Sequence, residues 1–109
     1  MPAPTALQPT RTHAFVHRNI PWYLKSRAKA FNDRVFIAWE PFSGEPATYT
    51  YTELADNGRK VAQGLYQLGV RQGDYVIVHM INCPEFIFTW FALSELGAIA
   101  VTTNTRSSL

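Results

Sequence analysis

The chain has 109 residues, which is room for one small domain. Its net charge is only +2, so the composition gives no electrostatic argument for binding nucleic acid or an anionic membrane. The single cysteine, Cys83, excludes an intrachain disulfide and a cysteine-rich metal site, and it suits a reducing compartment. Residues 1–15 lack the apolar run of a secretory signal, so we expect a soluble, cytoplasmic protein.

The apolar content is high for a chain of this length. Apolar residues make up 47% of the sequence and aromatic residues 14%, which fits a piece of a large buried core better than a self-sufficient small domain. The longest apolar helix that we predict, residues 83–96, is shorter than the roughly 20 residues that cross a bilayer. We therefore expect no membrane span.

The first half of the chain predicts an arm, a helix and a hairpin. Residues 1–18 are rich in proline, threonine and alanine and have no hydrophobic period, so we expect a flexible arm. Residues 19–31 predict a short helix with Asn19 as its N-cap. Residues 35–39 and 47–51 predict two strands, and the proline- and glycine-containing loop between them indicates an antiparallel hairpin.

A second helix is expected from about Tyr51. Thr50 and Glu53 have the spacing of a capping box, in which each side chain accepts a hydrogen bond from the other residue's backbone amide. Gly69 supplies the left-handed residue that ends the helix, with Val70 folding back on the last turn. The apolar stripe expected to face a core recurs at steps of three and four residues: Leu54, Gly58, Val61, Ala62, Leu65 and Leu68.

The last third of the chain predicts a strand, a helix and a second strand. Residues 75–80 are apolar on both faces, which is typical of a parallel strand inside a sheet that is covered on both sides. Asn82 is the expected N-cap of the following helix, with Pro84 in its first turn. The helix over residues 85–96 has hardly any polar face, so we expect it to need more covering protein than this chain contains.

Gly97 is expected to end that helix, and a further strand starts at Ile99. The connection has the length of a right-handed parallel crossover. The predicted fold class is therefore α/β, with an antiparallel hairpin followed by a parallel strand–helix–strand unit in an incomplete sheet.

Four short motifs occur in an order that resembles the start of AMP-forming acyl-CoA synthetases, in the adenylate-forming superfamily. The resemblance covers about residues 22–109, most of the chain. The chain departs from the family's usual sequence at two positions near its end. Thr102 stands where the family usually has proline, and Thr105 stands in place of another proline. The motifs are Thr50–Leu54, Leu68–Val76, Asn82–Phe86, and Leu96–Ile99 with Asn104–Arg106.

The resemblance implies that residues 19–109 are the N-terminal fragment of an AMP-binding large domain. The complete enzymes use ATP, Mg²⁺ and CoA to convert a carboxylic acid into an acyl-CoA, through an acyl-adenylate. Their phosphate-binding loop and catalytic lysine come later than any residue here, and this chain has neither of the common glycine-rich phosphate motifs. We therefore expect the chain alone to be inactive, and we assign it no catalytic, cofactor-binding or metal-binding residue.

The three histidines and the cysteine are candidate site residues. His13 and His17 are four residues apart and could share a metal, but the segment offers no third ligand, so we favour a chance arrangement. His79 comes near the carboxyl end of a strand, where open α/β sheets bind ligands, although a structural role is favoured. Cys83 could be a nucleophile at a helix start, but no basic partner is evident.

Other candidates have simple structural interpretations. Ser43 and Gly44 lack the flanking glycine of a nucleophile elbow and are expected in the hairpin loop. Asn104 and Arg106 could line the acyl or nucleotide side of a complete enzyme, with Asn104 favoured as a turn former. The aromatic helix suggests a fatty-acid pocket, yet such a helix is ordinarily core.

Two function classes stay open from the sequence. In the first, the chain is a scaffold segment of an acyl-CoA synthetase, and its partner is the remainder of the large domain. In the second, it is a non-catalytic association module that pairs with itself or with another protein through an exposed strand edge. Either way we expect association through the apolar face of residues 86–96 and the last strand. The acid is also open, whether short-, medium- or long-chain, aromatic or carnitine-type.

Overall fold

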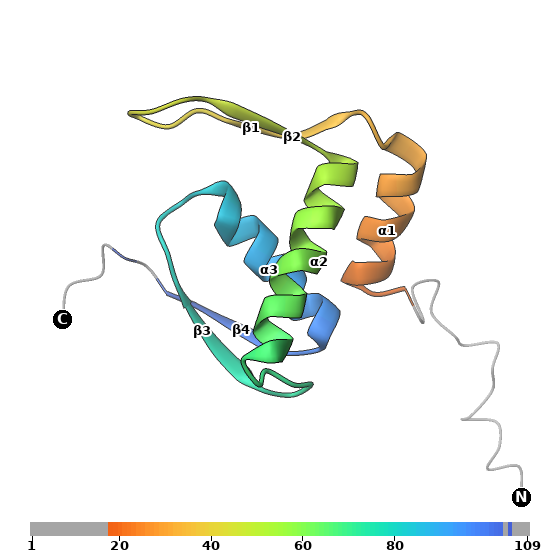
Figure 1. Cartoon of the computed structure of the whole chain (residues 1–109), viewed down its shortest axis with the longest axis vertical. Helices are drawn as coiled ribbons and strands as arrows, with labels where there is room; N and C mark the ends of the chain where they lie inside the picture. Colours follow the sequence, from red (N-terminus) through yellow and green to blue (C-terminus); the bar gives the residue numbers. More distant parts are fainter. Residues whose placement is uncertain (1–17, 104, 106–109) are drawn as a thin grey trace, which may run out of the picture.

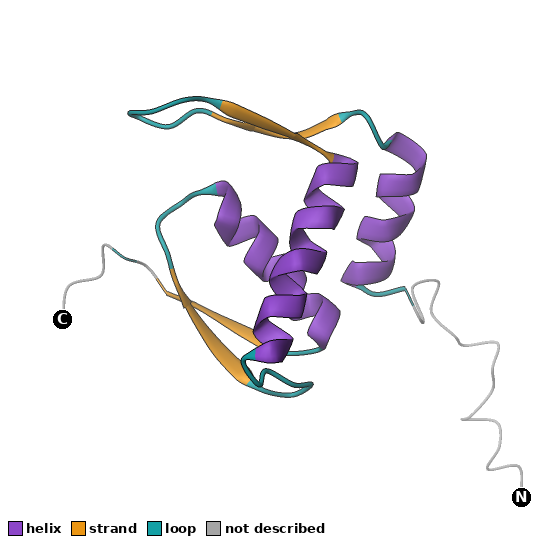
Figure 2. Ribbon diagram, in the orientation of Figure 1, coloured by secondary structure: helices purple, strands orange, loops and turns teal. Residues whose placement is uncertain are grey.

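The computed structural model describes residues 18–103 and 105. Three helices lie side by side, with a hairpin at one end of them and a small parallel sheet against the third helix (Figure 1). The elements are α1 (Ile20–Phe31), β1 (Val35–Trp39), β2 (Ala47–Thr50), α2 (Tyr51–Gln67), β3 (Tyr75–His79), α3 (Pro84–Leu96) and β4 (Ile99–Thr103). The α/β class predicted from the sequence is confirmed (Figure 2).

Helix α1 lies on the surface of the described part of the chain. The predicted cap is present, since the Asn19 side chain accepts a hydrogen bond of 3.0 Å from the backbone amide of Trp22. No residue of this helix is fully buried, although it packs against both α2 and α3. The Lys25 ammonium donates to the Glu95 carboxylate at 3.0 Å, which links α1 to α3.

The predicted antiparallel hairpin is confirmed by the pairing of β1 with β2. Aromatic edges hold it against the helices: the Tyr49 ring lies 5.1 Å from the Phe88 ring, and the Phe36 ring lies 5.0 Å from the Tyr51 ring, as measured between centroids. Both contacts have the near-perpendicular geometry that aromatic pairs favour. The hairpin therefore packs on the first turns of α2 and on the first half of α3.

Helix α2 begins at the predicted capping box. The Glu53 amide donates to Thr50 Oγ1 at 3.1 Å, and the Thr50 amide donates to Glu53 Oε1 at 3.0 Å. Its buried residues, Leu54, Gly58 and Ala62, belong to the predicted stripe. Leu68 does not, because it is the C-cap beyond the helix's last residue and is 83% exposed.

Helices α2 and α3 end in the same way. The amide of Gly69 donates to the Tyr66 carbonyl and that of Val70 to the Leu65 carbonyl, at 3.0 and 3.1 Å. Gly97 and Ala98 repeat this pair of bonds, and both glycines have positive φ angles, 107° and 73°. These are Schellman motifs, in which glycine supplies the left-handed residue. Both predicted helix ends are thus confirmed.

Strands β3 and β4 pair in parallel, from Tyr75 opposite Ile99 to His79 opposite Thr103, as the sequence predicts. One face is directed at the helices, and its residue Val78 is buried. The other face has no covering element in the described part of the chain, so the expected cover on both sides is not met there (Figure 1). We call this surface the open sheet face. Its apolar residues are Tyr75, Ile77, Ile99 and Val101, which are 76, 70, 42 and 38% exposed.

The start of α3 differs from the prediction that Asn82 is its N-cap. Cys83 takes that position, with an extended backbone of φ −161° and ψ 162°, and its thiol makes no capping hydrogen bond. The reason is Pro84, because the residue before a proline is driven out of the helical region and towards the extended conformation. The helix therefore starts at the proline itself.

The expectation that α3 needs more cover than this chain contains is met only in part, because one side of the helix is buried and its other apolar residues are half-buried or exposed. Phe88, Ala92 and Leu93 are buried, because α3 lies between α2 and the β3–β4 sheet. Trp90 is the only large apolar residue of α3 that is exposed, at 38%. Between α3 and the sheet, most of the exposed apolar surface thus belongs to the sheet. No helix among the described residues is long and apolar enough to cross a membrane.

Candidate functional site

The carboxyl ends of β3 and β4 bring together a pair of polar side chains from the two strands. His79 and Thr103 are the last residues of adjacent strands, and His79 Nδ1 lies 2.5 Å from Thr103 Oγ1. Both residues are exposed. Thr103 Oγ1 also donates a long hydrogen bond of 3.5 Å to the Val78 carbonyl. This geometry fits a hydrogen-bonded, structural histidine, and that role stays a prediction.

Cys83 is half-buried at the start of α3. Within the described ranges, no basic side chain forms a hydrogen bond with its thiol. A nucleophilic cysteine needs a neighbouring charge or base to hold it as thiolate. The local geometry therefore gives no support for Cys83 as a nucleophile.

The remaining candidates lie in loops or outside the described residues. Ser43 is exposed in the loop between β1 and β2, next to Gly44, whose φ is 103°. His13, His17, Asn104 and Arg106 lie outside the described residues. In the part that the structure describes, no three His, Cys, Asp or Glu side chains gather to hold a metal ion.

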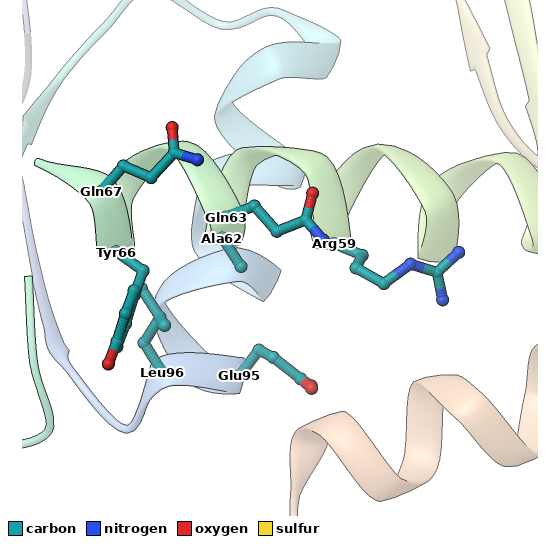
Figure 3. A pocket seen from close by; sticks show the side chains of 7 residues that line it. All are labelled: Arg59, Ala62, Gln63, Tyr66, Gln67, Glu95 and Leu96. Carbon is teal, nitrogen blue, oxygen red and sulfur yellow. The ribbon is translucent and has the colours of Figure 1, made fainter.

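Two open grooves flank Glu95. The first, about 490 Å³, lies between α2 and α3, and Figure 3 shows Arg59 and Glu95 extending from these two helices beside it. The second, about 500 Å³, lies between the start of α1 and the end of α3, where Trp22 and Lys25 line it. The residues that line the first groove are Arg59, Ala62, Gln63, Tyr66, Gln67, Glu95 and Leu96.

The charged groups of these grooves are already paired within the chain. Arg59 Nη2 lies 2.6 Å from Asp56, and Glu95 lies 3.0 Å from Lys25. Neither groove includes His79 or Cys83. Sequence reasoning missed the grooves because their walls come from three helices, and no local pattern signals contact between residues as distant as Lys25 and Glu95.

The described residues do not fit a triphosphate site. Such a site uses a glycine-rich loop whose amides point at the phosphates in front of a helix. Here Gly69 and Gly97 close helices, and Gly44 and Gly73 lie in turns that precede strands. The amino end of α2 is already occupied by the carboxylate of Glu53.

Residues 24–109 match a family model described as "AMP-binding enzyme". The chain belongs to the AMP-binding enzyme family. The match covers nearly the same residues as the resemblance found in the motifs, which is thereby confirmed. It covers α2, α3 and both pairs of strands, so the whole strand–helix–strand unit is part of the family's fold.

Curated relatives of the chain include CoA ligases. The crotonobetaine/carnitine–CoA ligase of Salmonella arizonae is 40% identical over 79 residues, which are 72% of this chain and 15% of the relative. The protein of the same name from Escherichia coli O17:K52:H18 is 42% identical over the same shares. The chain thus spans only about 15% of the length of these relatives.

Solved structures are also similar to this chain over a small part of their length. The N-terminal subdomain of Klebsiella oxytoca NpsA superposes with a TM-score of 0.75 at 27% identity, over 83% of this chain and 22% of that one. O-succinylbenzoate coenzyme A synthetase (MenE) from Bacillus subtilis, in complex with AMP, gives a TM-score of 0.71 at 29% identity, over 79% and 21%. The superposed part of this chain therefore corresponds to about a fifth of each of these longer chains.

Proposed function

We propose that this chain is the N-terminal scaffold segment of an AMP-forming acyl-CoA ligase. In the complete enzyme, ATP and Mg²⁺ would activate a carboxylic acid as its adenylate, and CoA would accept the acyl group. The observation that supports this most strongly is the family match over residues 24–109, which includes every strand of the structure. The partner of the segment would be the rest of the large domain.

The chain's own residues would supply position rather than chemistry. Adenylate formation needs cations and hydrogen-bond donors around the triphosphate and a fixed carboxylate. The described residues offer a capped helical layer and one covered sheet face, with the reactive candidates His79 and Cys83 lying away from both grooves. We therefore infer that the chain by itself is inactive.

An exchange assay tests the inactivity of the isolated chain. Acid-dependent exchange of pyrophosphate into ATP should stay at background with every acid offered, including crotonobetaine and carnitine. Exchange above background that requires an acid would overturn this part of the proposal.

A chimera tests the scaffold role. The matched segment of the E. coli crotonobetaine/carnitine–CoA ligase would be replaced by the corresponding residues of this chain, and CoA ligase activity measured. We expect activity within about tenfold of the parent ligase. A matched chimera with Leu93→Asp, which places a charge at a fully buried position, should lose it. A folded chimera without activity would contradict the scaffold role.

A second candidate function is supported by the open sheet face. An apolar surface on a sheet with unpaired edges is suited to association with a second copy or with another protein. This non-catalytic module would need no later segment. A cytoplasmic location is proposed for either function, on the basis of the single unpaired cysteine, Cys83.

A further inference from the structure

The small net charge hides a strong separation of charge along the chain. Residues 18–34 contain five basic residues and one acidic residue, a net charge of +4. Residues 35–103 contain three basic and seven acidic residues, a net charge of −4. Helix α1 and the residues next to it thus form a positive region beside a negative segment, and Arg11 and Arg106, outside both ranges, bring the whole chain to +2. The five basic residues are Arg18, Lys25, Arg27, Lys29 and Arg34.

The solvent-facing side of α1 combines basic and aromatic side chains. Trp22, Lys25 and Lys29 follow each other at steps of three and four residues, so they share one face of the helix, and all are exposed. Tyr23 is next to this face and is 58% exposed. The guanidinium of Arg18 lies 5.1 Å from the Trp22 ring centre, in a cation–π contact. We call these five residues the α1 surface.

The opposite side of α1 packs on the protein. The helix is also held by the Lys25–Glu95 ion pair, beside the groove that Trp22 and Lys25 line next to α3. Leu24, Ala28 and Phe31 are half-buried and follow a helical spacing on that side. In Figure 1, α1 lies at the margin of the helical layer, with α2 between it and the β3–β4 sheet. Apart from Lys25, whose ammonium pairs with Glu95, the side chains of the α1 surface are exposed and can meet a flat partner.

We propose that the α1 surface docks on an anionic lipid surface, with α1 lying in the plane of the headgroups. Lysine and arginine bind anionic headgroups, while tryptophan and tyrosine settle at the boundary between headgroups and acyl chains. The negatively charged segment 35–103 would be repelled by the same surface. This repulsion orients the protein with α1 towards the lipid. The inference does not depend on the ligase chemistry.

The exposed apolar side chains on and beside the α1 surface favour lipid over nucleic acid as its partner. Ile20, Trp22 and Tyr23 are 40, 41 and 58% exposed, which gives an apolar component that phosphate contacts do not require. The open sheet face is the competing apolar surface, but the strand residues that form it include no lysine or arginine. Binding through the sheet would therefore show no preference for anionic lipid.

Sedimentation of the 109-residue chain with vesicles tests the proposal. Vesicles of phosphatidylcholine alone are compared with vesicles of three parts phosphatidylcholine to one part phosphatidylserine. We expect binding to the anionic vesicles, weakened by added salt, and little binding to the neutral ones. Equal binding to both would overturn the proposal in favour of adsorption through the open sheet face.

A pair of charge reversals locates the surface. Lys29→Glu and Lys60→Glu change the net charge equally, at an exposed position on α1 and an exposed position on α2. We expect Lys29→Glu to weaken binding to anionic vesicles by roughly fivefold or more and Lys60→Glu by less than about twofold. Equal losses would mean that only net charge matters, which would contradict a defined α1 surface.

A pair of tyrosine substitutions tests whether the aromatic side chains of the α1 surface contribute to vesicle binding. Tyr23→Ser should weaken vesicle binding several-fold, while Tyr75→Ser on the open sheet face should not, and the helical circular dichroism of both variants should match the parent. The reverse order would overturn the proposal. Binding to heparin or to a duplex RNA without binding to anionic vesicles would do so as well, because the positive region would then serve nucleic acid.

Discussion

One face of the β3–β4 sheet packs on helices, and the other is open although it is at least as apolar. Val78, on the covered face, is 5% exposed, whereas its neighbour Ile77 is 70% exposed. The difference follows from the single crossover, because the one helix between β3 and β4 can cover one face of their sheet only. Cover for the second face has to come from other segments or other molecules.

The largest effect is expected where the cover is complete. Leu93 is fully buried in α3, so Leu93→Ala should lower the free energy of unfolding by about 2–5 kcal/mol, measured by urea denaturation. The same substitution at Leu68, which is 83% exposed, should cost less than about 0.5 kcal/mol. Similar losses at the two positions would mean that the helical layer is not the core of this chain.

The end of α3 offers a smaller test, because it fixes where β4 starts against β3. Gly97 has a φ of 73°, and an added Cβ would lie 3.0 Å from Gln72 Cγ. Gly97→Ala should therefore cost about 1–2 kcal/mol in unfolding free energy. Gly64→Ala, inside α2 with nothing within 4 Å of the new Cβ, should instead stabilise by about 0.5–1 kcal/mol. The contrast between these two glycines fails if both variants shift the midpoint of urea denaturation in the same direction.

The smallest effect on stability, and the clearest on association, is expected on the open sheet face. Ile77→Ser removes an apolar group that is already 70% exposed, so the free energy of unfolding should change by less than about 0.5 kcal/mol. If the open sheet face mediates self-association, this variant should shift sedimentation towards monomer, whereas Leu68→Ser should not. A parent chain that is a monomer at high concentration would remove the association proposal.

Local signals in the sequence determined most of the elements. The capping box at Thr50 and Glu53, the glycines at 69 and 97, and the apolar period of α2 each act within a few residues, so they could be interpreted without the tertiary structure. The family resemblance rests on the same caps and turns in a fixed order. One local signal was misjudged: Pro84 moves the N-cap from Asn82 to Cys83.

Contacts between distant segments could not be predicted in this way. The link between Lys25 and Glu95, the two grooves beside it and the meeting of His79 with Thr103 join residues far apart in the chain. Hydrophobic pattern indicated that strand 75–80 and helix 85–96 both need cover, but not which of them receives it. Only the packing of α2 on α3 decided that one side of the helix is buried, whereas one face of the sheet is left open in the described part of the chain.

The sequence alone thus determined the class of fold, the helix boundaries to within a residue or two, and the family, because these depend on backbone conformation and short-range order. The tertiary structure decided where the exposed apolar surface and the positive surface lie. A net charge of +2 is a sum over the chain, whereas a surface depends on which side chains the fold gathers on one side of α1. Composition cannot supply that information, because it has no direction in space.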